Sequence, residues 1–117
     1  MKRIFTFGPF ELTERERLLR RAGSPVPLAP KAFDTLLLLV ENAGKLVARD
    51  QLLASVWKDT HVDEAVVTRV ISDLRRALRQ TDQQVWIETV PKFGYRFAAE
   101  VTVTAPEPEP APAAPRP

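Results

Sequence analysis

One stretch of the chain combines arginine with small hydroxyl side chains on what would be a single face of a helix. Over residues 63–79 the polar positions recur at helical spacing, at Thr68, Ser72, Arg75, Arg76 and Arg79, with Arg69 and Asp73 at the flank. The planar guanidinium group suits phosphate oxygens and the major-groove edge of guanine, and Thr and Ser can donate or accept hydrogen bonds without blocking a close approach. This face could therefore bind nucleic acid, although arginine is also a good helix former and a purely solvated face would look the same.

The element that would position these side chains is an amphipathic helix. Its apolar positions follow the spacing i, i+3, i+4, i+7 and i+11, at Val67, Val70, Ile71, Leu74 and Leu78. This spacing predicts a helix over about 63–79 with the apolar stripe against a core. A shorter helix of about two or three turns is predicted just before it, beginning near Arg49 or Asp50. A helix, a short connection and a second helix with a basic outer face form a helix-turn-helix, in which the second helix enters the major groove.

A β-hairpin is predicted directly after this helix. Residues 85–90 read as a strand, 91–94 as a turn and 95–97 as the returning strand, with Lys92 at the tip and Arg96 beside it. A basic hairpin in this place could lie along the DNA backbone or reach the minor groove, where the negative potential favours a cation.

The segments ahead of the helix-turn-helix predict a small sheet and one more helix. From residue 4 to residue 28, short alternating stretches are separated by turn residues at 8–9 and 23–25, which indicates short antiparallel strands. The next helix is predicted between Pro30, which suits a first helical position, and Gly44, which suits the stop. Residues 45–47 are expected to form a short extended link.

Two helix starts lack a capping side chain. Ala29 and Ala48 stand immediately before the first and second predicted helices. Because alanine has no side-chain acceptor, each site is expected to forgo roughly 0.5–2 kcal/mol of stability.

Composition excludes several classes of function. The 117 residues are 44% hydrophobic, enough for one core, and they include no cysteine, so disulfides, thiolate metal sites and a cysteine nucleophile are excluded. The longest apolar run, 36–40, is far shorter than the roughly 20 residues of a membrane span, so the chain is expected to be soluble. No glycine loop for phosphate and no paired metal motif is present, and His61 is interpreted as a loop residue rather than a metal ligand or pH-sensing group. We therefore expect no enzyme and no cofactor.

Net charge and the distribution of proline give further information about partners and domain boundaries. The net charge of +2 is too small to indicate nucleic-acid binding by itself, although the isoelectric point of about 9.3 leans that way. Residues 105–117 alternate proline with small or charged residues, a pattern that favours extended polyproline II and cannot form a core. We therefore expect a domain over 1–100 and a proline-rich, disordered linker or tail over 101–117, with a linker to a further region favoured over a frayed end.

Four fragments in this order and spacing resemble the OmpR/PhoB-type winged-helix family. They are LAPKAFDTLLLLVENAG at 28–44, LVARDQLLASVW at 46–57, ISDLRRAL at 71–78 and IETVPKFGYRF at 87–97. The resemblance implies an α+β winged helix-turn-helix with an N-terminal antiparallel four-stranded sheet, three helices and a C-terminal β-hairpin wing. It also implies sequence-specific binding of double-stranded DNA by a bacterial transcription regulator, with the third helix in the major groove.

The resemblance assigns candidate DNA contacts position by position. The base-facing set is Thr68, Arg69, Ser72 and Asp73, to which Arg76 is added. The backbone set is Arg49, Trp57, Arg75, Thr89 and Tyr95, to which Arg79 is added. The wing contributes Lys92 and Arg96.

At two places the sequence departs from the family pattern, which changes the DNA contacts that the resemblance implies for this chain. PhoB-like members often carry arginine at the positions of Ser72 and Asp73, so the DNA sequence recognised should differ. Asp73 could accept a hydrogen bond from a cytosine amino group, or it could pair with Arg69 or Arg76, and pairing is the favoured interpretation. At the wing, Pro91 and Lys92 replace an arginine-glycine pair, which shifts the basic residue and puts minor-groove insertion in doubt.

The wider context is also set by the resemblance. A winged helix followed by a proline-rich linker resembles the ToxR/CadC-like arrangement, which places the domain in the cytoplasm, at the cytoplasmic face of the inner membrane. Double-stranded DNA is the expected partner, and RNA polymerase is a further one. We expect the fragment to be monomeric and to pair on DNA or through a region beyond the linker. The alternative function is a winged helix that contacts proteins without binding DNA, which acidic residues near the start of the third helix would favour.

Overall fold

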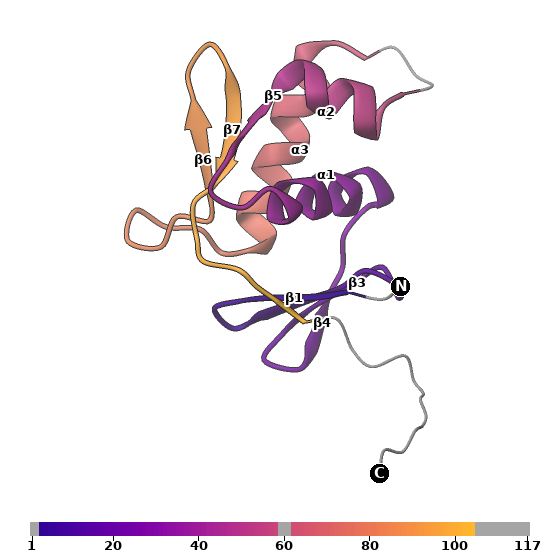
Figure 1. Ribbon diagram of the computed structural model, residues 1–117, viewed down its shortest axis with the longest axis vertical. Helices are drawn as coiled ribbons and strands as arrows, with labels where there is room; N and C mark the ends of the chain where they lie inside the picture. The colour runs from indigo at the N-terminus through magenta and orange to yellow at the C-terminus, as the bar shows by residue number, and fades with distance from the viewer. Residues whose placement is uncertain (1–2, 59–61, 105–117) are drawn as a thin grey trace.

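The computed structural model describes residues 3–58 and 62–104 and arranges them as two small sheets around three helices (Figure 1). The chain begins with four strands and a helix: β1 Ile4–Phe7, β2 Phe10–Thr13, β3 Leu18–Arg21, β4 Ser24–Val26 and α1 Pro30–Glu41. It continues with β5 Leu46–Ala48, α2 Arg49–Val56 and α3 Glu64–Ala77, and it closes with β6 Ile87–Val90, β7 Gly94–Phe97 and β8 Thr102–Thr104. The predicted α+β class with three helices and a C-terminal hairpin is confirmed.

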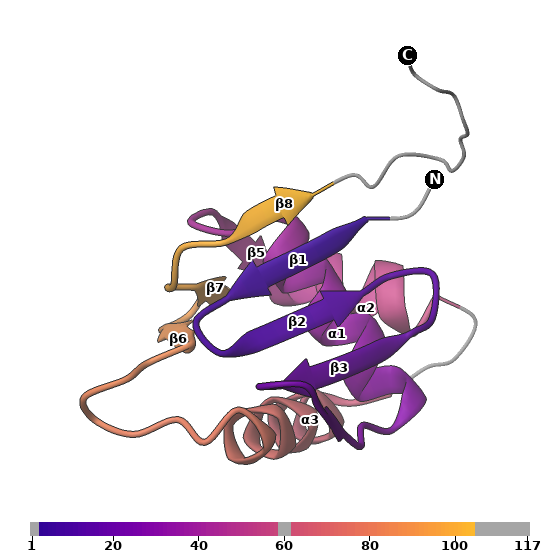
Figure 2. The same cartoon turned by 90° about the horizontal axis from the view of Figure 1, so that it is seen from below.

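The N-terminal sheet has five strands in the order β4-β3-β2-β1-β8, one more than the four that were expected. Its neighbouring strands are antiparallel, and β8 lies along the outer edge of β1 with Thr6 opposite Thr102 (Figure 2). Placing the end of the domain at residue 100 was therefore too early, because residues 101–104 are an alternating run of valine and threonine that suits a strand. The rest of the expected linker, 105–117, lies outside the described residues.

An aromatic cluster joins the five-stranded sheet to the hairpin and to the segment that precedes it. The Phe7 ring packs edge-on against Phe97, with 5.0 Å between ring centroids, and the Phe10 ring packs edge-on against Trp86 at 5.3 Å. Gly8 makes this packing possible, because a Cβ atom there would lie 2.5 Å from the Trp86 ring. The N-terminal sheet is thus fixed to the segment that follows α3.

The helices cross one another above this cluster, with α1 in contact with both α2 and α3. The predicted apolar stripe of α3 is confirmed, since Val67, Ile71, Leu74 and Leu78 are buried and Val70 is partly buried. As expected, neither Ala29 nor Ala48 caps its helix with a side-chain hydrogen bond. None of the helices in residues 3–58 and 62–104 is long and apolar enough to cross a membrane.

The second sheet holds the hairpin against the rest of the domain, in the order β5-β7-β6. The short extended link expected over 45–47 is, over residues 46–48, the strand β5, in which Val47 is fully buried and pairs with Tyr95 of β7. Gly94 permits this approach, since a Cβ atom there would lie 2.1 Å from the backbone oxygen of Val47. The hairpin is therefore anchored, through β7, on the strand that leads directly into α2.

Candidate nucleic-acid interface

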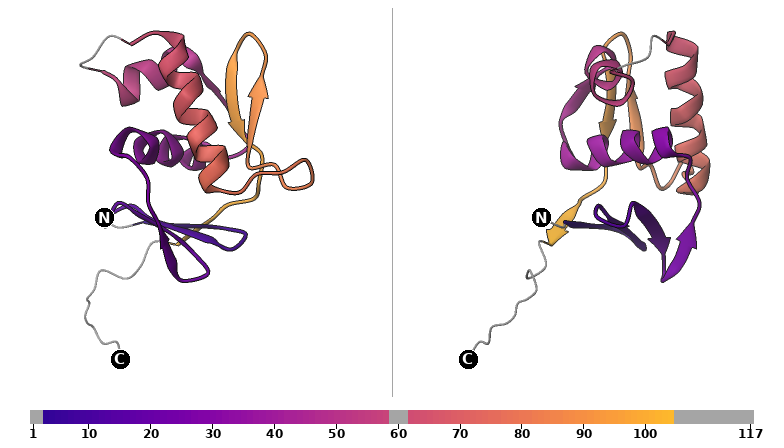
Figure 3. Two further views of the ribbon diagram at one scale, coloured as in Figure 1. Left: turned by 180° about the vertical axis from the view of Figure 1, so that it is seen from behind. Right: turned by 90° about the vertical axis from the view of Figure 1, so that its right-hand side faces the viewer.

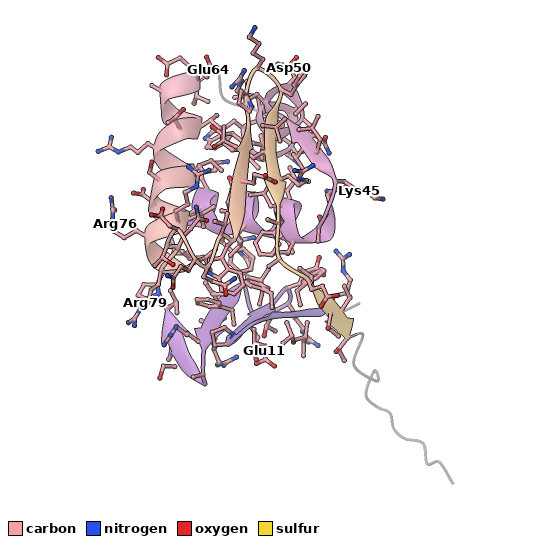
Figure 4. All side chains as sticks on the ribbon, turned by 90° about the vertical axis from the view of Figure 1, so that its left-hand side faces the viewer. Glu11, Lys45, Asp50, Glu64, Arg76 and Arg79 are labelled. Carbon is pink, nitrogen blue, oxygen red and sulfur yellow. The ribbon has the colours of Figure 1, made fainter. Side chains whose placement is uncertain are left out.

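The polar face of α3 is turned outward, away from the core. Seen from behind, α3 stands at the surface with the hairpin β6–β7 at its side (Figure 3). The predicted base-facing residues are all exposed: Thr68, Arg69, Ser72, Asp73 and Arg76. Arg76 and Arg79 extend from the same side of the helix (Figure 4). Within residues 3–58 and 62–104, no other element covers this row of polar side chains.

Three of these residues have partners on their own helix. The Thr68 hydroxyl donates to the backbone oxygen of Glu64 at 3.1 Å, so its oxygen remains able to accept from a ligand. Arg76 Nη1 lies 3.3 Å from Asp73 Oδ1, and both side chains are mostly exposed. The favoured interpretation of Asp73 as a pairing residue thus holds in the structure, with Arg76 as the partner.

Arg75 differs from the other arginines of α3 because it faces the hairpin. Its Nε and Nη2 atoms donate to the Ile87 oxygen at 3.2 and 3.1 Å, and Nη2 also donates to Thr89 Oγ1 at 2.7 Å. Two residues expected to contact the DNA backbone, Arg75 and Thr89, are therefore bonded to each other. Their bond fixes the hairpin beside α3, which sets how far apart these two elements stand.

The starts of α2 and α3 meet close to the tip of the hairpin. Arg49 Nε lies 2.7 Å from Glu64 Oε2, and the Arg49 backbone N–H donates to the Phe93 oxygen at 3.2 Å. Arg49 is partly buried, whereas Glu64 is mostly exposed. A predicted phosphate-binding arginine is thus held by a carboxylate at the edge of the face that α3 presents.

The hairpin carries its own charges. Arg96 and Glu88 face each other on neighbouring strands, with Arg96 Nη2 2.6 Å from Glu88 Oε1. At the tip, Lys92 has a positive φ of 73° and Phe93 is 62% exposed. Of the two basic residues assigned to the wing, Arg96 is paired along the hairpin, while Lys92 stands at its outer end.

Trp57 and Tyr95, both assigned to the backbone set, belong largely to the core, each with 5% of its surface exposed. Trp57 follows the last residue of α2, and Tyr95 lies between Val47 and Thr89 in the second sheet. Any contact that they make with DNA is limited to a small part of the side chain.

Two of these ion pairs were not expected from the sequence, Arg49 with Glu64 and Arg96 with Glu88. The pair Glu88–Arg96 could have been found, because the register of a short hairpin places these residues opposite each other. The pair Arg49–Glu64 could not, because it joins two helices whose relative position no local pattern specifies. His61 and Asp59 lie outside the described residues, and no group of three or more potential metal ligands occurs within 3–58 and 62–104.

Comparison with known proteins matches this geometry. Residues 23–97 match the family described as "Transcriptional regulatory protein, C terminal". The chain is 34% identical over 100 residues to the transcriptional activator CadC of Escherichia coli and 41% identical over 99 residues to the transcriptional regulator HilA of Salmonella typhi. These alignments cover 84% and 85% of the chain but only 20% and 18% of the relatives, so the chain spans about a fifth of their length.

Two solved structures share the fold. The DNA-binding domain of E. coli CadC superposes with a TM-score of 0.75 at 34% identity, covering 85% of this chain and 94% of that one. The DNA-binding domain of Klebsiella pneumoniae RstA, determined in complex with the RstA box, superposes with a TM-score of 0.70 at 32% identity, covering 81% of this chain and 96% of that one.

Proposed function

The chain belongs to the OmpR/PhoB-type family of DNA-binding domains found in bacterial transcriptional regulators, and we propose that it binds DNA with α3 in the major groove and the hairpin β6–β7 against the backbone. The observation that carries this docking mode is the outward face of α3, with Arg49 and the tip of the hairpin together at the end where α3 begins. The structure of the similar RstA domain in complex with the RstA box supports DNA binding by this chain, and the helix-turn-helix geometry supports the docking mode.

Within this docking mode, the side chains divide by what they can recognise. Thr68, Arg69, Ser72 and Arg76 are short or forked polar groups on the exposed face, so they are the proposed readers of base edges. Asp73 takes part through its pair with Arg76, which sets the direction of that guanidinium. The proposed backbone contacts are Arg49, Trp57, Arg75, Arg79, Thr89 and Tyr95, with Lys92 and Arg96 on the wing.

Salt dependence tests binding itself. If about four to six phosphates are neutralised, log affinity should fall against log salt with a slope of roughly −4 to −5. Fluorescence anisotropy on a duplex selected from a random pool, measured across a salt series, gives this slope. Absence of binding even at low salt would leave the face of α3 as a protein-contact surface, for which the pairing of Arg49, Arg76 and Arg96 with carboxylates would then be the supporting observation.

Two variants separate base readers from backbone contacts. Arg69→Ala should weaken the selected sequence by about 1–3 kcal/mol and change random DNA little, because a base contact is lost. Arg49→Ala should weaken all sequences alike and flatten the salt slope by about one, because a phosphate contact is lost. Equal losses on selected and random DNA for both variants would show that Arg69 does not read bases.

The assembly on DNA follows from the size of the domain. A single winged helix covers about 600–1,000 Å² of its own surface, too little for tight selection of a genomic site. We therefore propose a monomer in solution that pairs on half-sites spaced near one helical turn, with 105–117 as a linker to a region that reinforces pairing. A cytoplasmic location and contact with RNA polymerase belong to the same proposal for the whole protein. Sedimentation of the free domain, then with one and two half-sites, tests the pairing.

A further inference from the structure

The β3–β4 hairpin and the end of α3 form two hollows that share Arg21 and Arg79 in their lining. Their volumes are about 390 and 300 Å³. Trp86 of the aromatic cluster lines the smaller one. Among the described residues, no aspartate or glutamate lines either hollow, so this is a site with two guanidinium groups and no counter-ion of its own.

Arg21 differs in this respect from its neighbours on the N-terminal sheet. Arg17 pairs with Asp34 at 2.7 Å, and Arg20 lies 3.6 Å from a Glu16 oxygen. Arg21 makes no ion pair with any residue in 3–58 or 62–104, and its Nε atom is buried without a hydrogen-bond partner. Its guanidinium carbon lies 5.9 Å from the centroid of the Phe10 ring, which holds the charge beside the hollow. A partly buried cation without a counter-ion attracts an anion from outside.

Arg79 and Trp86 add further hydrogen-bond donors to the lining. Arg79 follows α3 in a left-handed conformation, φ 58°, and its side chain leaves the lower end of the helix next to the N-terminal sheet (Figure 4). The Trp86 indole Nε1 is buried and, within the described part of the chain, has no acceptor. Because two guanidinium groups and an indole N–H line the site and no carboxylate among the described residues does, the chemistry favours a ligand that only accepts hydrogen bonds, such as a phosphate group.

We propose that Arg21 and Arg79 bind one phosphate of the DNA backbone, which extends the DNA contact from α3 to the N-terminal sheet. This inference rests on the proposed function. The 14 residues of α3 span about 21 Å, whereas the major groove is about 12 Å wide, so a helix lying in the groove brings an end to the flanking backbone. The end near Arg49 and the wing meets one strand, and the end at Arg79 meets the other. Arg79 stands on the same side of α3 as Arg76 (Figure 4).

The test compares two variants, each of which replaces one arginine of the N-terminal region with the neutral residue glutamine. Arg21→Gln removes the proposed contact, and Arg15→Gln removes an exposed arginine from the turn between β2 and β3 as a matched control. On a duplex that extends about one helical turn beyond the site, Arg21→Gln should weaken selected and random DNA alike, about three- to tenfold, and reduce the salt slope by about one. Arg15→Gln should leave both quantities within about twofold of the wild type. Equal behaviour of the two variants would overturn the proposal.

Three further measurements separate this proposal from its alternatives. Arg21→Lys keeps the positive charge and should retain the wild-type salt slope. If Arg21→Gln lowers Tm, the salt slope of Arg21→Lys tests the contact in its place. Shortening the duplex on the side of Arg79 should abolish the difference between Arg21→Gln and wild type, because the contacted phosphate is removed. Inorganic phosphate could shift the Trp86 indole N–H resonance in a saturable titration while Arg21→Gln keeps the salt slope of the wild type. That result would identify a site for a free anion and overturn the assignment to DNA. Binding of the wild type to DNA tests the proposed function by itself, and the difference between Arg21→Gln and the wild type tests this inference.

Discussion

The Nε atom of Arg49 lies 2.7 Å from a carboxylate oxygen of Glu64, so the first residue of α2 is tied to the first residue of α3. A phosphate that approaches Arg49 meets a guanidinium that already has an anionic partner. In the proposed contact between Arg49 and the DNA backbone, Glu64 competes with a phosphate for the same charge, and binding exchanges one anion for the other.

Glu64→Gln should raise affinity for selected and random DNA alike, by about two- to fivefold, because exposed ion pairs are worth about 0.2–1 kcal/mol. Anisotropy titrations of Glu64→Gln and of Glu11→Gln measure the effect. Glu11 is an exposed carboxylate on the N-terminal sheet, so its variant has the same change in net charge at a distance from α3 (Figure 4). A loss of affinity in Glu64→Gln would show that Glu64 positions Arg49 for DNA instead of competing for it.

Arg75 should matter more for stability than any other arginine of α3. Arg75→Ala removes the hydrogen bonds to Ile87 and Thr89 that join the helix to the hairpin, which should lower the free energy of unfolding by about 1.5–3 kcal/mol. Arg76→Ala, at a side chain 79% exposed, should change it by less than about 0.5 kcal/mol. Urea denaturation distinguishes the two, and equal midpoints would mean that the bonds to the hairpin contribute no net stability.

Lys92→Gly should move stability and DNA affinity in opposite directions. A left-handed backbone costs a residue with a Cβ about 1–2 kcal/mol, and glycine avoids this cost while losing the cation. The variant should therefore unfold at a higher temperature yet bind all sequences more weakly, with the salt slope flatter by about one. Lys45→Gly, at an exposed position without a positive φ, should gain no stability. Lower Tm in Lys92→Gly would refute the strain argument.

Glu14 should contribute to the loss of stability in acid. Hydrogen bonding to the Arg3 guanidinium, with 2.7 Å between Arg3 Nε and Glu14 Oε1, lowers the pKa of Glu14 below its ordinary value. A lowered carboxyl pKa adds stability above the unfolded pKa of about 4.3, and this stability is lost as pH falls through the folded pKa. Wild type should exceed Glu14→Gln in unfolding free energy at neutral pH, with the gap closing as pH falls below about 4. A gap that stays constant with pH would exclude this linkage.

Patterns of burial could be predicted from the sequence, and contacts between distant side chains could not. The stripe at Val67, Ile71 and Leu74 specifies α3 because helical spacing repeats within a few residues. Valine and threonine alternate over 101–104, which is typical of a strand, but the run is short and borders the proline-rich segment 105–117. The sequence alone therefore placed Thr102–Thr104 in the linker. The partners of Arg49 and Arg75 depend on how α2, α3 and the hairpin pack together, which no single segment specifies.

Because β1 pairs with β8, one edge of β1 has no partner until β8 has been synthesised. Thr6 is opposite Thr102, so one edge of β1 finds its partner only when nearly the whole domain has been made. At about 5–20 residues per second, this edge stays open on the nascent chain for roughly 5–20 s after β1 itself is made. Open strand edges invite pairing with other chains, so on the ribosome the protein passes through an interval in which β1 can recruit the wrong strand. The interval ends when β8 has been made and pairs with β1.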